Sequence, residues 1–401
     1  MSAIPSHRRV FGNELKYVEE VLATEFRSSQ GSMFMRRVEQ AFAEKFGSPY
    51  AISFVNGTAT MHAALEAKGI GPGDEVIVPP LTMSATSFAV LQTGATPIFA
   101  DVDADTFQID PKSIAERITP NTRAIITVAL YGLSPDMNPI MALADKHRLF
   151  VIEDNAQCFL GKYDGKIAGT IGHCASFSFQ SSKHITSGEG GMIITADLEL
   201  AEGIRKVQSL GYAGVSATKG KITKRDIQDP DYSRHVTMGW NYRMPELCCA
   251  VALAQLENID ALVQARVEAA MKFEQAARTC DWLVPQKTPA NCTHSYWTWV
   301  AKLTRDDIPW HAFRDRFTEL GGHGVYAAWK LTYLEPMFVN MNLLGRERFI
   351  APEIKEQYAP GLCPVAEAIQ PRLLQFKTNY WDDTQAQKQA DILERTIASF
   401  R

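Results

Sequence analysis

Residues 174–196 read CASFSFQSSKHITSGEGGMIITA. This stretch contains two apolar runs, CASFSF at 174–179 and MIITA at 192–196, whose length and composition are typical of buried strands. Between them lie a loop of small residues with one lysine, Lys183, and a glycine-rich turn. A lysine enclosed by backbone loses hydration, which lowers its pKa and makes it a candidate Schiff-base amine. For the lysine taken by itself, a solvated loop position is the alternative interpretation.

Similar apolar runs precede this stretch and alternate with amphipathic segments. The runs are YAISFV (50–55), EVIVPP (75–80), TPIFADV (96–102), TRAIITVALY (122–131) and RLFVIEDN (148–155). Strands that are apolar throughout and separated by helices indicate a parallel sheet covered on both faces. The sequence therefore predicts one α/β domain across residues 50–200.

The pattern changes after residue 245. Residues 245–277 have a long helical pattern without internal glycine or proline, and SYWTWVAKL (295–303) is strand-like. We predict a large α/β domain over 1–245 and a linking helix with a smaller α+β domain over 246–401. Residues 211–239 form a polar connection too long for an ordinary loop, which predicts a flap or binding loop.

Composition excludes several classes of protein. The chain has 401 residues and a net charge of −4, which differs from the basic character of a nucleic-acid binder. Its seven cysteines show no CxxC spacing, so neither a disulfide framework nor a metal site is predicted. The N-terminus lacks the apolar segment of a signal peptide, and no apolar run approaches the ~18 residues of a spanning helix. These features predict a cytoplasmic protein without nucleic-acid or membrane partners.

Three segments that follow strands carry candidate chemistry. Asn56-Gly57-Thr58 lies where a helix begins and suits a phosphate, although a plain helix cap is the alternative. Asp154 ends an apolar strand, where a carboxylate is costly unless it is paired or used; a capping acid is the alternative there. Together with Lys183, these segments provide an anion cradle, an acid and an amine. Pyridoxal 5'-phosphate (PLP) needs all three.

Motifs along most of the chain resemble the DegT/DnrJ/EryC1/StrS family of PLP-dependent sugar aminotransferases. The similar stretches are NGTAT–HAAL (56–65), GIGPGDEVIVPPLT (69–82), GATPIFADVD (94–103), LYGLSPDM (130–137), VIEDNAQC (151–158), SFSFQSSKHITSGEGG (176–191), GWNYRM (239–244) and CPVAE (363–367). The resemblance implies an aspartate-aminotransferase-like large domain, of PLP fold type I, with a mainly parallel sheet.

The resemblance also implies roles for individual residues. Lys183 would form the internal aldimine with PLP and shuttle the proton, and Asp154 would pair with the pyridine nitrogen. Gln157 would bind the 3′-oxygen of the ring, and His184 would point elsewhere. The remaining cofactor-binding residues would be Gly57, Thr58 and Ser178 on the phosphate, Met83 on the ring face, and Asn241 on the phosphate of the neighbouring subunit's cofactor. The expected assembly is a homodimer with shared active sites.

The function implied is transfer of an amino group from glutamate to a keto or aldehydo sugar in the biosynthesis of lipopolysaccharide, another surface polysaccharide or an antibiotic sugar. Departures from the family pattern bear on that sugar. Met83 replaces a usual aromatic residue, and residues 322–338 and 373–383 differ from the usual sequence. The acceptors to consider are therefore an 8-oxo-3-deoxy-octulosonate and a nucleotide-linked 4-keto-6-deoxyhexose. A PLP-dependent sugar dehydratase, a non-sugar aminotransferase and a non-catalytic regulator on the same fold are the alternatives, and the lysine at 183 favours the aminotransferase.

Overall fold

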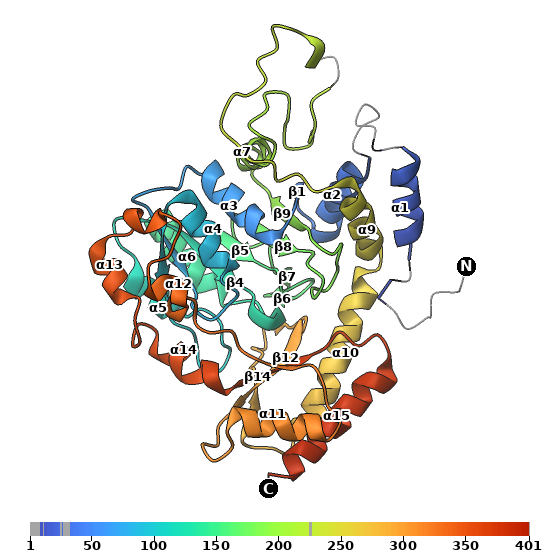
Figure 1. Ribbon diagram of the computed structural model, residues 1–401, viewed down its shortest axis with the longest axis vertical. Coiled ribbons are helices and arrows are strands. Elements are labelled where there is room, and N and C mark those ends of the chain that lie inside the picture. Colours follow the sequence, from blue (N-terminus) through green and yellow to red (C-terminus); the bar gives the residue numbers. More distant parts are fainter. Residues whose placement is uncertain (1–8, 11, 25, 27–32, 224–226, 401) are drawn as a thin grey trace.

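The computed structural model describes residues 9–10, 12–24, 26, 33–223 and 227–400. Its centre is a seven-stranded sheet in the order β1-β9-β8-β5-β4-β2-β3 (Figure 1). Six strands run in one direction, and only β9 is antiparallel to its neighbours. The strands are β1 (Tyr50–Phe54), β2 (Glu75–Val78), β3 (Thr96–Phe99), β4 (Thr122–Val128), β5 (Phe150–Asp154), β8 (Cys174–Ser178) and β9 (Gly191–Thr195).

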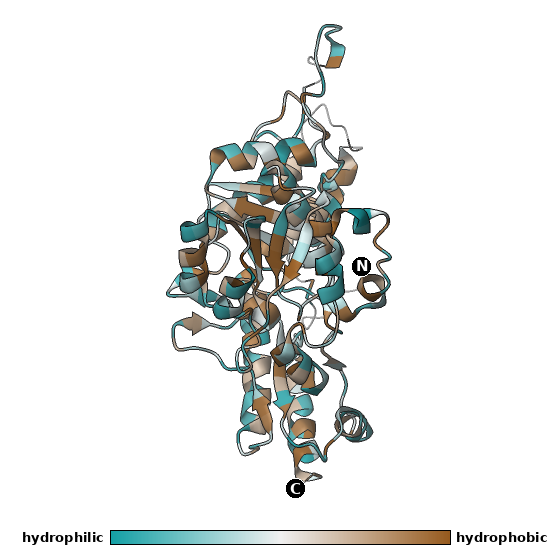
Figure 2. Ribbon diagram, turned by 90° about the vertical axis from the view of Figure 1, so that its left-hand side faces the viewer, coloured by the Kyte–Doolittle hydropathy of each residue, from teal (hydrophilic) through white to brown (hydrophobic). Residues whose placement is uncertain are grey.

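Helices cover both faces of this sheet, because the strands are apolar along their length and successive side chains point to opposite faces. Ile126 of β4 packs in the core beneath α3, α4 and α7, whereas its neighbour Ile125 packs beneath α5 and α6 on the opposite face. Figure 2 shows the resulting hydrophobic sheet in the interior of the molecule. The helices are α1 (Glu14–Ala23), α2 (Met33–Phe46), α3 (Gly57–Ala67), α4 (Ala85–Thr93), α5 (Pro111–Arg117), α6 (Met137–His147), α7 (Leu198–Gln208) and α9 (Glu246–Glu257).

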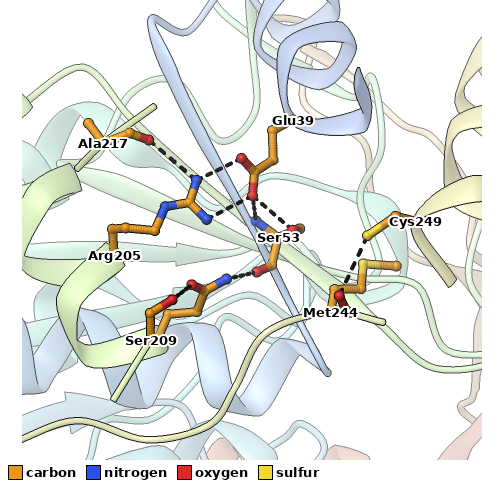
Figure 3. Close-up of polar contacts among 8 residues, drawn as sticks. Glu39, Ser53, Arg205, Ser209, Ala217, Met244 and Cys249 are labelled. Carbon is orange, nitrogen blue, oxygen red and sulfur yellow. Dashed lines mark hydrogen bonds and ion pairs between the residues drawn. The ribbon is translucent and has the colours of Figure 1, made fainter. Parts of the chain in front are cut away.

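A buried ion pair joins three of these elements (Figure 3). Arg205 of α7 donates to both oxygens of Glu39 of α2, at 3.0 and 2.6 Å. Glu39 also accepts hydrogen bonds from the backbone N–H and the hydroxyl of Ser53 in β1, at 2.9 and 2.8 Å. Arg205 donates in addition to the carbonyl of Ala217 at 3.3 Å. Each of the two charges therefore has several partners.

A second sheet lies toward the C-terminus, with strand order β10-β12-β14-β13 and antiparallel pairing throughout. Three helices pack around it. These elements are β10 (Leu283–Pro285), β12 (Thr298–Leu303), β13 (Val325–Ala327), β14 (Leu373–Lys377), α10 (Ile259–Ala277), α11 (Trp310–Glu319) and α15 (Asp383–Ala398). A third, small sheet joins β6 (Lys162–Tyr163), β7 (Lys166–Ile167) and β11 (Cys292–Thr293).

The helical pattern over 245–277 forms two helices rather than one. Asn258 separates α9 from α10 with φ −114° and ψ 13°, which is outside the helical range. Its side-chain amide donates to the carbonyl of Ala254 at 3.0 Å. Asparagine side chains compete for helix backbone groups in this way, so Asn258 ends the helix although no glycine or proline is present.

Residues 328–369 return to the large sheet. Their side chains belong to the same hydrophobic core as β2 and β4. Polar contacts reinforce this packing: the Tyr358 hydroxyl donates to the carbonyl of Pro97 at 2.7 Å, and Asp101 accepts from the backbone N–H of Val365 at 2.8 Å. The segment contains the short helices α12 (Pro336–Val339), α13 (Pro352–Gln357) and α14 (Pro364–Ile369). The division of the chain at 245/246 stays a prediction.

The long connection between α7 and α9 projects from the body of the molecule (Figure 1). Residues 224–226 of this connection lie outside the described residues. Its two arms are joined by hydrogen bonds from Ala213 N–H to the carbonyl of Arg234 and from Val236 N–H to the carbonyl of Gly211, at 2.9 and 2.8 Å. Val236 and Met238 are 57% and 73% exposed. The connection thus holds apolar side chains in solvent within this single chain.

Candidate active site

A cavity of about 360 Å³ lies at the carboxyl ends of the parallel strands. Such strand ends form the usual ligand crevice of an open α/β sheet. The strands β1, β2, β4, β5 and β8 all contribute residues at or just after their last position. The lining residues include Gly57, Thr58, Thr82, Met83, Val128, Asp154, Gln157, Ser178, Ser182, Lys183, Trp297 and Trp329.

The last two residues of β5 are both buried carboxylates, with different surroundings. Glu153 accepts three backbone N–H groups, from Gly169, Ile171 and Gly172, so it holds the following loop. Asp154 lines the cavity and accepts from the Thr86 hydroxyl at 2.9 Å and from Ala156 N–H at 3.1 Å. Burial raises the pKa of Asp154, and these two hydrogen bonds and the charge of Lys183 oppose that shift. Of these two carboxylates, Asp154 is therefore the one that can meet a ligand cation.

Lys183 lies in the loop after β8, and two arginines fix the backbone of that loop. Arg266 of α10 donates to the carbonyls of Ser182 and Lys183 at 2.7 and 3.0 Å. Arg9 donates to the carbonyls of Ser181, at 2.6 Å, and Lys183. The ammonium nitrogen of Lys183 lies 4.6 Å from the ring centre of Trp297.

The surroundings of Lys183 lower its pKa and so raise the fraction of neutral amine above that of an ordinary lysine. Burial lowers the pKa of Lys183 to about 8, with Asp154 raising it and the positive charge of Arg266 lowering it further. Among the described residues, no carboxylate oxygen lies within 4.0 Å of its nitrogen. A neutral amine is the nucleophilic form of lysine. His184 is directed away, since its Nε2 contacts the carbonyl of Ser295 at 2.8 Å.

The opposite end of the cavity is the N-terminus of α3. The Asn56 side chain accepts from Ala59 N–H at 2.8 Å, so this residue is a helix cap, as the alternative interpretation of the segment held. Gly57 and Thr58 line the cavity beside Ser178. A Cβ at position 57 would lie 3.2 Å from the Cβ of Ser178. The absent side chain thus lets the helix N-terminus and a hydroxyl face one small space, an arrangement that suits an anion.

The side-chain amide of Gln157 is oriented by a hydrogen bond from a backbone N–H group. Its Oε1 accepts from the N–H of Tyr131 at 2.7 Å, which directs the amide nitrogen to the other side. Since Gln157 lines the cavity, that nitrogen is the end available as a donor to a ligand oxygen.

Two tryptophans complete the wall, and the sequence did not assign either to the site. Trp297 and Trp329 stack at 6.0 Å between ring centres, and Trp297 Nε1–H donates to the carbonyl of Ser182 at 2.9 Å. Tyr296 has φ 48°, so the chain enters β12 through a left-handed residue. Trp297 lies in the bend just before β12 and packs with the large sheet, while Trp299, within β12, packs in the core of the small one. Strand alternation alone would place both on one face.

The structure brings seven of the eight expected residues to this cavity. They are Gly57, Thr58, Met83, Asp154, Gln157, Ser178 and Lys183. Met83 is 50% exposed, on the outer side of the cavity. Asn241 is exposed and does not line it. A role for Asn241 toward a neighbouring subunit stays a prediction.

The chain matches known proteins along most of its length. Residues 10–393 match the model of the DegT/DnrJ/EryC1/StrS aminotransferase family. The chain belongs to this family. It is 40% identical to a GDP-perosamine synthase of Caulobacter vibrioides over 75% of this chain and 78% of the relative. An aminotransferase structure from Psychrobacter cryohalolentis is 29% identical, with a TM-score of 0.84 and 96% of each chain covered. DesV of S. venezuelae, solved in complex with a ketimine intermediate, is 26% identical with a TM-score of 0.80, covering 96% of this chain and 94% of that one.

Family membership confirms the predicted fold class, cofactor and type of enzyme: the protein is an α/β PLP-dependent sugar aminotransferase. The cavity fits the cofactor on its own evidence. Its lining combines an anion cradle at Gly57, a buried carboxylate at Asp154 and a lysine of lowered pKa at Lys183. Within the described ranges, no helix is both long and apolar enough to span a membrane.

Proposed function

We propose that this aminotransferase moves the amino group of L-glutamate to the carbonyl carbon of a sugar, with Lys183 as the residue that reacts with PLP. The observation that carries the proposal is the arrangement of Lys183 and Asp154 on one cavity at the strand ends. The reaction has two halves, because glutamate must leave as its keto acid before the sugar enters. PLP, when bound, supplies an aldehyde that takes up the amino group and a ring that withdraws electrons from the adjacent carbon.

The residues of the chain would handle protons and orientation. Lys183 Nζ would remove the proton from the α-carbon of the donor, and its lowered pKa gives it a larger neutral fraction than an ordinary lysine has. Asp154, oriented by Thr86 and Ala156 N–H, would hold the proton on the ring nitrogen. Gly57, Thr58 and Ser178 would bind the phosphate, and the amide nitrogen of Gln157 would donate to the ring oxygen.

We also propose a homodimer in which Asn241 and the connection 211–239 reach the neighbouring subunit. Asn241 is exposed and lies two residues beyond this connection. Val236 and Met238 expose apolar surface on it, which is typical of a protein interface. Cofactor in such a dimer would be held by residues of both subunits.

The acceptor is a keto or aldehydo sugar of a bacterial surface polysaccharide. The name of the relative in Caulobacter vibrioides supports a nucleotide-linked sugar. The departures at Met83 and in residues 322–338 and 373–383 support an acid such as 8-oxo-3-deoxy-octulosonate. A dehydratase is less well supported, because Lys183 lies on the cavity with a lowered pKa.

The absorption spectrum of the PLP-loaded protein tests the donor half-reaction. L-glutamate is expected to remove the visible band, while D-glutamate, as the control, leaves it. The aminated form is then offered 8-oxo-3-deoxy-octulosonate and GDP-4-keto-6-deoxymannose, and mass spectrometry detects the amino sugar. A visible band that persists with L-glutamate would contradict glutamate as the donor. A band that disappears without any amino sugar from either compound would contradict both acceptors.

A further inference from the structure

A second cavity, of about 580 Å³, adjoins the cofactor cavity. Ser182, Trp297 and Trp329 line both, so the two spaces meet at the stacked tryptophans. The second cavity extends from there over the small sheet. Its lining residues are Ser182, Arg266, Trp297, Thr298, Tyr326, Ala327, Trp329, Gln375, Lys377 and Asn379.

The charge of this lining is positive. It contains Arg266 and Lys377 and no aspartate or glutamate. The guanidinium of Arg266 already donates to the carbonyls of Ser182, Lys183 and Trp297 and to the Thr378 hydroxyl. Over the described part of the chain, no carboxylate oxygen lies within 4.0 Å of the Lys377 ammonium. Lys377 is therefore the charge in this lining that is available to a ligand.

The fold directs Lys377 into this space. Lys377 is the last residue of β14 and lies opposite Thr298 in the antiparallel ladder, so both side chains share one face. Gln375, two residues earlier, lies on the same face. Gly324 makes room for the stem of the lysine, since a Cβ there would lie 2.5 Å from Lys377 Cδ.

Polar groups of the lining lack hydrogen-bond partners among the described residues: the Nε of Arg266 is buried without one, and the Lys377 ammonium, whose nitrogen lies 5.1 Å from the ring centre of Tyr380, contacts no carboxylate. The Oγ1 of Thr298 is buried and, among the described residues, has no hydrogen-bond partner. Burial lowers the pKa of Lys377. Unpaired buried donors and charges are costly, and an anion in the cavity would accept from the Thr298 hydroxyl and the Lys377 ammonium.

We propose that the second cavity binds a carboxylate of the acceptor sugar, with Lys377 and Thr298 as its donors. This inference rests on the proposed function, because it assumes that the carbonyl end of the same sugar lies in the cofactor cavity. A carboxylate fits better than a diphosphate. Lys377 provides a single positive charge, and the two terminal nitrogens of Arg266, which would recognise a phosphate oxygen pair, already donate to backbone carbonyls. The acceptor class is thus a sugar acid.

The test compares Lys377→Met with Lys377→Arg and with a matched control, Lys388→Met. Lys388 is exposed on α15 of the same region and lies outside both cavity linings. For the PLP-loaded enzyme, Lys377→Met is expected to raise the KM for 8-oxo-3-deoxy-octulosonate by about tenfold to a hundredfold, the value of one charged hydrogen bond. The kcat and the reaction with glutamate are expected to stay unchanged. Lys377→Arg is expected to restore part of the affinity, and Lys388→Met to have no effect.

A binding measurement gives a readout that does not depend on turnover. Calorimetry with 3-deoxy-octulosonate, which has the carboxylate but no reactive aldehyde, is expected to show binding to the wild type and to Lys388→Met but not to Lys377→Met. Equal binding to all three would overturn the inference. A rise in KM only for GDP-4-keto-6-deoxymannose would also overturn it, because the occupant would then be a diphosphate. Failure of the glutamate reaction would contradict the proposed function, while calorimetry would still decide the role of Lys377.

Discussion

The α/β layer buries charged groups at two places, and it treats them differently. At the first, between α2, α7 and β1, Glu39 and Arg205 contact each other directly, and Glu39 accepts two more hydrogen bonds from Ser53 (Figure 3). At the second, the cofactor cavity, Asp154 has two donors and Lys183 has no carboxylate within 4.0 Å among the described residues.

This difference distinguishes charged side chains that stabilise the fold from charged side chains that can bind a ligand. A buried ion pair whose charges contact each other directly offers little to a small molecule, and breaking it leaves an isolated charge. An incompletely paired acid and amine cost stability in the free protein and gain partners when a ligand binds. The same contrast holds within β5, where Glu153 has three backbone donors and Asp154 faces the cavity.

The largest effect is expected from Lys183→Met. Turnover should fall by more than about a thousandfold, and the visible band of the PLP-loaded protein should disappear, because the amine that reacts is gone. Folding should not suffer, since the change removes a poorly compensated buried charge. Lys146→Met, at an exposed position of α6, is the control. A variant that keeps its activity would exclude Lys183 as the reacting residue.

The next largest effect is expected from Glu39→Gln, which breaks the paired site. It should lower the free energy of unfolding by about 3–5 kcal/mol, because Arg205 is left buried without its counter-charge. Glu44→Gln, at an exposed position of the same helix, should change it by less than about 0.5 kcal/mol. Denaturant unfolding followed by circular dichroism measures both. The contrast between the two sites would fail if Glu39→Gln and Glu44→Gln were equally stable.

The smallest effect concerns pH. The rate at which cofactor-free protein captures PLP covalently should rise with pH through about 8 and level off above it, because the amine reacts only after it loses its proton. Asp154→Asn should move the midpoint to lower pH, since the negative charge of Asp154 raises the pKa of Lys183. Stopped-flow absorbance measures both profiles. A wild-type rate that still rises above pH 10 would indicate a lysine of ordinary pKa.

The site residues at the strand ends could be predicted from the sequence for a physical reason. β5 and β8 are parallel neighbours, with Asp154 paired opposite Ser176, so the residues that follow them meet at one edge. A buried strand that ends in an acid and a neighbouring strand that ends in a lysine loop thus predict one site. Their chemical roles stay predictions.

The other residues around the cavity could not be predicted from the sequence, because they come from distant parts of the chain. Thr86, whose hydroxyl donates to Asp154, lies in α4. Trp329 belongs to a segment without strand or helix periodicity. Trp297 faces the cavity from a bend just before β12, next to Tyr296, whose left-handed conformation is one that a non-glycine residue seldom adopts. Backbone exceptions of this kind leave no periodic signal.

The contacts of Arg266 have a mechanical consequence. One guanidinium from α10 grips the carbonyl of Lys183 on one side and the carbonyl of Trp297 and the hydroxyl of Thr378 on the other. Arg266 thereby links the small sheet directly to the backbone of Lys183. Because one guanidinium holds both, a displacement of the small sheet would also displace the backbone of Lys183.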